Sequence, residues 1–145
     1  MAFDSIRAVV GTFGQIYKEG KWLTQYNKAT ASVEITKAEI RVAGDRWVRH
    51  KVTDLKGSGS ISGYKVTDEL LQEISVVTLS DKPSFRTELI FVLNDPEAWG
   101  YERIRLKNVM FDNIDLANWE HGQEIQEEWN FTFEGFELLD PLEAA

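Results

Sequence analysis

Residues 125–134, IQEEWNFTFE, alternate apolar and polar side chains more regularly than any other stretch of this 145-residue chain. Trp129, Phe131 and Phe133 fall on one side of the alternation, and polar residues fall on the other. A period of two is typical of a β-strand that buries one face. We therefore expect a strand here, with its aromatic face in the core of a mainly β protein.

Further stretches with strand character lie on the N-terminal side of this strand. We expect a hairpin over residues 15–24, a half-buried strand from residue 29, a weak or edge strand at 59–65, a strand at 85–94 that is apolar on both faces, and two strands centred on 101–107 and 109–116. Together these segments predict an antiparallel sheet of roughly eight short strands.

One helix is predicted over residues 66–79, because the apolar residues Leu70, Leu71, Ile74 and Val77 recur at helical spacing. Thr67 is the expected N-cap. The fold class that follows is mainly β, an antiparallel β-barrel or sandwich with one flanking α-helix. At 145 residues we expect a single domain over residues 1–145.

The stretch from residue 44 to residue 65, GDRWVRHKVTDLKGSGSISGYK, is too long for an ordinary connector and is predicted to be a long assembly loop. A tryptophan among cations is typical of a protein contact. The candidate contact residues are Arg46, Trp47, Arg49, His50 and Lys51. The glycine- and serine-rich second half is predicted to be the hinge of the loop, at Gly57, Gly59 and Gly63.

The net charge of −8 is unevenly distributed along the chain. No Lys or Arg follows Lys107, whereas ten carboxylates lie between Asp112 and Glu143. One interpretation is a solvated acidic face. The other is that the basic segment of one subunit meets the acidic tail of another. The acidic balance argues against binding of duplex DNA, which needs an excess of cations.

Residues that could carry chemistry are few. The chain has no cysteine, and its two histidines, His50 and His121, lie far apart in sequence. The spacing of Gly57, Gly59 and Gly63 departs from the dinucleotide-binding pattern. We therefore expect no catalytic residue, no cofactor and no metal site, and a protein that is not an enzyme.

A small β-barrel that binds a ligand or a protein is an alternative interpretation. Such a protein needs an apolar cavity with a few polar anchors, whereas the aromatic residues of 129–136 are better explained as filling a closed core. Trp47 and Trp99 are expected in loops, which favours contacts with protein partners.

Two blocks of residues resemble the tail tube proteins of PBSX-type phage-like elements and related contractile-tailed phages. The first block comprises Gly44, Asp45, Arg46, His50, Lys51, Thr53, 57–60 and 64–67. The second comprises Glu102, Arg103, Ile104, Leu106, Val109, Phe111, Asp112, Glu124, Glu127, Glu128, 131–134 and Phe136. The resemblance covers most of the chain from residue 44 to residue 136.

This resemblance implies a β-barrel subunit of hexameric rings that stack into a hollow tube inside a contractile sheath. The implied fold is similar to the tube protein of type VI secretion and to the tubes of R-type bacteriocins. The implied partners are other copies of the chain, the sheath protein, and baseplate and tail terminator proteins, with DNA only in transit through the lumen if the tube belongs to a phage. The long loop is implied to reach an adjacent subunit or ring.

The start of the chain, MAFDSIRAVV, lacks the features of a secretory signal, and no apolar run approaches the ~20 residues of a membrane span. We expect synthesis in the cytoplasm of a bacterial host, followed by incorporation into a virion tail or a released tail-like particle. A phage tail and a tail-like bacteriocin would use the same kind of subunit.

Overall fold

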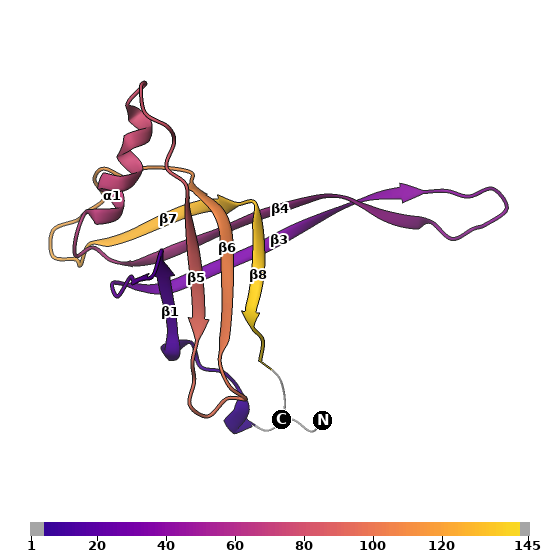
Figure 1. The fold of residues 1–145 in the computed structure, drawn as a ribbon, viewed down its shortest axis with the longest axis horizontal. Helices are drawn as coiled ribbons and strands as arrows, with labels where there is room; N and C mark the ends of the chain where they lie inside the picture. Colours follow the sequence, from indigo (N-terminus) through magenta and orange to yellow (C-terminus); the bar gives the residue numbers. More distant parts are fainter. Residues whose placement is uncertain (1–4, 143–145) are drawn as a thin grey trace.

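The computed structural model describes residues 5–142, and its architecture is mainly β, as predicted. The elements in chain order are η1 Ser5–Arg7, η2 Gly11–Phe13, β1 Gly14–Lys18, β2 Lys21–Trp22, β3 Tyr26–Ile40, β4 Arg49–Tyr64, α1 Glu69–Ile74, η3 Ser75–Thr78, β5 Thr87–Leu93, β6 Glu102–Phe111, β7 Gln126–Phe133 and β8 Gly135–Asp140. Figure 1 shows β1, β5, β6 and β8 side by side in one layer, with β3, β4 and β7 crossing them in the other.

All strand pairs are antiparallel, in the order β2-β1-β5-β6-β7-β4-β3, with β8 added beside β6. Strand β6 belongs to both layers: residues 102–109 pair with β5 and residues 103–107 with β8, while Met110 and Phe111 pair with β7. Just before this change of partner, Asn108 adopts a φ of 52°. This irregularity lets one strand change layer. Within residues 5–142 the ends of the sheet, β2 and β3, do not pair with each other, so the fold is an open sandwich rather than a closed barrel.

Two sequence predictions near these strands need correction, and one strand has no counterpart among the predictions. The two strands expected at 101–107 and 109–116 are the single strand β6, because Asn108 absorbs the break without ending the strand. Residues 59–65, expected to form an edge strand, lie mostly in β4, between β3 and β7. Strand β8 was not predicted, although Phe136 and Leu138 alternate with Glu137.

The predicted hairpin is confirmed as β1 and β2, joined by a two-residue turn. Both turn residues have positive φ, 51° at Glu19 and 85° at Gly20. This geometry is the one that matches the twist of hairpin strands. Lys18 and Lys21 form ion pairs with Glu73 and Glu69, respectively, and so fix the helix to the hairpin.

The helix is shorter than the predicted range of 66–79. α1 begins at Glu69 and passes into the 3₁₀ turn η3 at Ser75. The residue at the N-cap position is Asp68 and not Thr67, and its side chain makes no capping hydrogen bond. Leu70 and Ile74 are buried as expected, whereas Val77 is exposed because the 3₁₀ turn changes the residue period.

The predicted aromatic face of β7 is confirmed as the centre of the core. Phe131 is fully buried, and Trp129 and Phe133 are buried beside it. Phe111 meets the rings of Trp129 and Phe131 edge to face, with centroids 6.0 and 6.1 Å apart. Leucine, isoleucine and valine side chains from the other strands complete the cluster, including Ile16, Ile61, Leu89, Leu106 and Val109.

Strands β3 and β4 are long, with 15 and 16 residues, and only their inner halves belong to the sandwich. Strand β7 pairs with β4 from Gly57 to Tyr64 and no further. Beyond that point β3 and β4 pair only with each other, out to Ile40 opposite Arg49. We call residues 34–56 the arm; it projects away from the rest of the molecule (Figure 1).

Candidate assembly interface

The predicted contact residues are brought together at the outer end of the arm. Arg46 and Trp47 lie in the connector between the two strands, and Arg49, His50 and Lys51 begin β4. All five side chains are exposed. The prediction of a long loop over 44–65 is wrong, because residues 49–64 form β4 and the connector is limited to residues 41–48.

The connector is organised by Asp45. Its Oδ1 accepts a hydrogen bond from the backbone N–H of Trp47 at 2.9 Å, and its Oδ2 accepts one from Nη2 of Arg49, also at 2.9 Å. The Trp47 N–H and the Arg49 guanidinium lower the pKa of Asp45 below its ordinary value. Gly44, with a φ of 81°, supplies the left-handed conformation that the turn requires. The tip therefore has a defined shape that presents Trp47 outward.

Trp47 is the most exposed large hydrophobic residue of the described chain, at 81%. Burying a tryptophan removes roughly 150–250 Å² from water. At about 25 cal/mol per Å², covering this side chain would release about 4 kcal/mol of gross hydrophobic free energy. Trp47 is therefore placed to be an anchor for a partner.

One face of the arm continues the core face of the sandwich. Gly57 pairs with Phe133 of the core and with Val33 of β3, which places Val33 on the core side. Ile35 and Leu55 face each other two residues further out on the same side. They are 56% and 68% exposed. The strand predicted from residue 29 is confirmed, but its expected half-burial is wrong for this part, because no second layer covers it.

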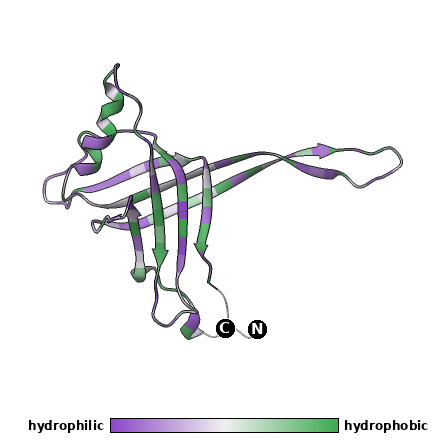
Figure 2. Cartoon of the chain, viewed as in Figure 1, coloured by the Kyte–Doolittle hydropathy of each residue, from purple (hydrophilic) through white to green (hydrophobic). Residues whose placement is uncertain are grey.

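Because this face is uncovered, the arm lacks the second layer that normally stabilises a β-hairpin. A two-stranded hairpin is at best marginally stable in water without a covering layer. Residues 34–56 are all exposed except Asp45 and Val48, which are half-buried. Figure 2 shows apolar segments on the arm as well as on the strands of the sandwich. The arm thus combines an uncovered apolar face with an anchor at its tip.

The predicted hinge glycines do not lie in a flexible segment. Gly57, Gly59 and Gly63 belong to the part of β4 that is paired on both edges. A Cβ at residue 59 would lie 2.2 Å from the carbonyl oxygen of Thr30, and one at residue 57 would lie 2.4 Å from the Phe133 ring. These positions are glycine because neighbouring groups approach closely, so the hinge prediction is corrected to a packing role.

A groove of about 540 Å³ lies at the root of the arm, between the two layers. Its lining includes Val33 from β3, Phe91 from β5, Ile104 from β6 and Phe136 from β8. Phe136 remains 58% exposed. The groove follows from the open sandwich, and the sequence missed it because its aromatic residues indicated a closed core.

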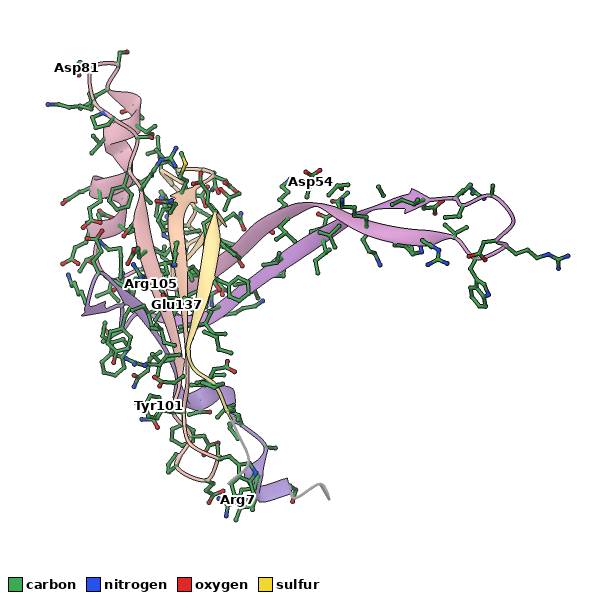
Figure 3. The ribbon with its side chains drawn as sticks, turned by 45° about the vertical axis from the view of Figure 1, so that its right-hand side comes forward. Arg7, Asp54, Asp81, Tyr101, Arg105 and Glu137 are labelled. Atoms are coloured by element: carbon green, nitrogen blue, oxygen red, sulfur yellow. The ribbon has the colours of Figure 1, made fainter. Side chains whose placement is uncertain are left out.

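Three of the C-terminal carboxylates form ion pairs within the chain. Glu137 accepts a hydrogen bond from Nη1 of Arg105 at 3.4 Å, and Glu134 lies 3.2 Å from Nη1 of Arg86. Asp140 pairs with Arg103. Figure 3 shows Arg105 and Glu137 close together on the sandwich. The residues that pair with these carboxylates lie outside the arm; Glu143 is outside the described residues.

Neither a metal cluster nor a membrane-spanning helix is found in residues 5–142. The described part of the chain holds no group of three or more potential metal-ligating His, Cys, Asp or Glu side chains. No described helix is both long enough and apolar enough to cross a bilayer.

Comparison with protein families now decides between a tube subunit and a binding module. The sequence profile of the phage tail tube protein family matches residues 1–140. The chain belongs to this family. The predicted resemblance is confirmed at the level of individual relatives: the chain is 31% identical to the phage-like element PBSX protein XkdM of Bacillus subtilis (strain 168), with 98% of this chain and 97% of XkdM covered. It is also 31% identical to YqbM of the same organism, with 99% of each chain covered.

Solved structures agree with the family at the level of the fold. One similar chain comes from the sheath-tube complex of an extracellular contractile injection system in the extended state, with a TM-score of 0.73, 6% identity and 90% of each chain covered. Another comes from the sheath/tube terminator of the same kind of system, with a TM-score of 0.75, 6% identity, and 92% of this chain and 97% of that chain covered. The chain is a tail tube protein with the fold of contractile injection system tube proteins.

Proposed function

We propose that this chain is the structural subunit of the inner tube of a contractile phage tail or a phage tail-like bacteriocin, in which hexameric rings stack around a central channel. The observation that carries the proposal is the arm, a projecting hairpin whose apolar face and anchor have no cover within the described chain. A neighbouring subunit of the tube would supply this cover.

Unpaired strand edges support a ring. Within residues 5–142, β3 pairs only with β4, and β8 pairs only with β6. Exposed edges of this kind promote association with other chains unless they are protected. Pairing of edges between adjacent subunits would protect them and close the sheet around the ring, while the arms would connect each subunit to a further neighbour.

The proposed partners are other copies of the chain, the tail sheath protein, and the baseplate and terminator proteins. The similar structures come from a sheath-tube complex, a sheath/tube terminator and a baseplate, which supports this set. In a phage tail, DNA would only pass through the lumen, and the net charge of −8 disfavours its adhesion.

The subunit acts as a single domain, performs no catalysis and needs no cofactor. It is made in the bacterial host cytoplasm and becomes part of a virion tail or a released tail-like particle.

Removal of the arm tests the proposal. Residues 35–55 are replaced by Asn-Gly, so that a two-residue turn joins Glu34 to Lys56, which are paired in the sheet. We expect a folded monomer by circular dichroism and no tubes by negative-stain electron microscopy, under conditions in which the wild-type chain forms hollow rods. The control is Gln72→Ala, which substitutes an exposed residue of α1, and this variant should polymerise normally. Rods of normal length from the shortened chain would contradict the proposal.

A further inference from the structure

The connector between β6 and β7 is the longest stretch without regular structure after β4. Residues 112–125 contain no helix or strand, and connections of more than about 12 residues are usually functional or disordered. Leu116 and Trp119 are 76% and 63% exposed. The Trp119 ring stacks on His121, with centroids 5.5 Å apart and planes 9° from parallel. We call residues 112–125 the acidic loop.

The acidic loop carries four carboxylates that the described chain leaves without a cation. It contains Asp112, Asp115, Glu120 and Glu124 and no Lys or Arg. None of these four side chains forms an ion pair within residues 5–142. The carboxylates of β8, in contrast, are paired in place. The excess of negative charge in the C-terminal third is therefore concentrated beside an exposed tryptophan.

The arm tip has the complementary composition. Residues 41–51 hold four basic side chains and one carboxylate, Asp45. Arg49 is engaged by Asp45 and Arg41 by Glu39, whereas Arg46 and Lys51 form no ion pair in the described chain. These two free cations flank Trp47 in sequence.

The tip and the acidic loop cannot meet within one molecule. Figure 1 shows the arm tip at one end of the longest axis and the connector between β6 and β7 at the other. A contact between them must join two copies head to tail. Contacts of this heterologous type generate closed rings or open helical polymers.

We propose that the arm tip of one copy binds the acidic loop of a second copy, with Trp47 packed against Leu116 and Trp119 and with Arg46 and Lys51 beside Glu120 and Glu124. Buried aromatic anchors supply most of the affinity of such contacts, and the complementary charges around them set register and partner choice. The inference rests on the proposed tube function and names the surface that receives the arm.

A charge-exchange cycle tests the pairing. The tip variant is Arg46→Glu with Lys51→Glu, the loop variant is Glu120→Lys with Glu124→Lys, and a third chain combines all four changes. Each variant alone brings like charges together, and we expect its critical concentration for assembly to rise about tenfold, which corresponds to about 1.4 kcal/mol. The combined chain restores complementarity and should return to within about threefold of wild type. Lys82→Glu and Asp81→Lys, at exposed residues away from both surfaces, change the net charge in the same directions as the tip and loop variants, by half as much, and control for the sign of that change.

Nuclease-treated protein is used throughout, so that assembly does not depend on nucleic acid bound by the basic tip. A combined chain that is as defective as the worse single variant, or a tip variant that assembles like wild type, would overturn the pairing. The arm-replacement experiment separates this failure from failure of the tube proposal: loss of tubes on arm removal together with no charge rescue would mean that the arm binds another surface.

Cysteine cross-linking gives an independent readout, because the chain has no native cysteine. Ala43→Cys and Asn118→Cys chains, which change exposed residues beside the two surfaces and keep Trp47 and Trp119, are mixed, assembled and treated with a short thiol-reactive cross-linker. We expect a cross-linked pair that contains one chain of each kind. Trp22→Cys, on the exposed β2, replaces Asn118→Cys in the control and should give no such product with Ala43→Cys. Equal cross-linking of both combinations would contradict the proposed contact.

Discussion

The two halves of β4 differ in how many neighbouring strands they pair with. The inner half, from Gly57 to Tyr64, is paired with β3 on one edge and with β7 on the other. The outer half, from residue 49 to residue 56, is paired with β3 alone and is exposed throughout. The inner half is paired on both edges, whereas the outer half has an apolar face that no other part of the described chain covers. Substitutions in the two halves should therefore change different properties, stability in one and assembly in the other.

The largest expected effect is on the inner half. Gly59→Ala would place a Cβ 2.2 Å from the carbonyl oxygen of Thr30, which is backbone and cannot move aside easily. We expect the free energy of unfolding in urea to fall by about 2–3 kcal/mol. Gly11→Ala, where nothing lies within 4 Å of the added atom, is the control and should leave stability nearly unchanged. A neutral Gly59→Ala would mean that residues 57–63 are a flexible loop after all.

The next effect belongs to the outer half. Leu55→Ser removes an exposed leucine from the apolar face of the arm, so the stability of the monomer should change by less than about 0.5 kcal/mol. If a neighbour covers this face, a loss of about 1.5–3 kcal/mol of burial should raise the critical concentration for assembly at least about tenfold. Lys56→Ser, on the opposite face, is the matched control for light-scattering measurements. Equal effects of the two substitutions would place the contact elsewhere on the arm.

The smallest effect concerns the shape of the tip. The pKa of Asp45 is lowered in the folded chain by the Trp47 N–H and by Arg49, so the ionised carboxylate stabilises the tip above the pKa of the unfolded chain. That contribution is lost as the pH falls through the lowered pKa. We expect the Trp47 amide resonance to shift in an NMR titration from neutral pH into acid, with a midpoint below the ordinary pKa of about 3.9 for aspartate. The shift should be absent from Asp45→Asn; a full transition in that variant would assign it to another group.

The sequence predicts the parts of the fold that have a strong alternating pattern or a local turn. The alternation around Trp129 and Phe131 is strong because one face of β7 is core and the other is not. The hairpin turn at Glu19 and Gly20 is local in sequence, and so it was also predictable.

The arm could not be predicted as a hairpin, because its outer strand has no core in the same chain to impose a regular pattern. Glycine and serine residues in β4 favoured a loop, although Gly59 is present to let β3 approach closely. The contact residues around Trp47 could be proposed from composition alone. That these residues lie together at the tip of a hairpin follows from the pairing of Ile40 with Arg49. This pairing register depends on the tertiary structure and is not encoded in the local sequence pattern.

Hydrogen–deuterium exchange of residues 34–56, compared between free subunits and assembled tubes, tests most directly whether the arm is completed by a neighbour. In free subunits these amides should exchange rapidly, because a two-stranded hairpin without cover opens readily. In tubes we expect their exchange to slow at least about tenfold, corresponding to about 1.4 kcal/mol of added protection, while Gly57–Tyr64 stays protected in both states. Equal exchange of the arm in free and assembled protein would contradict the account.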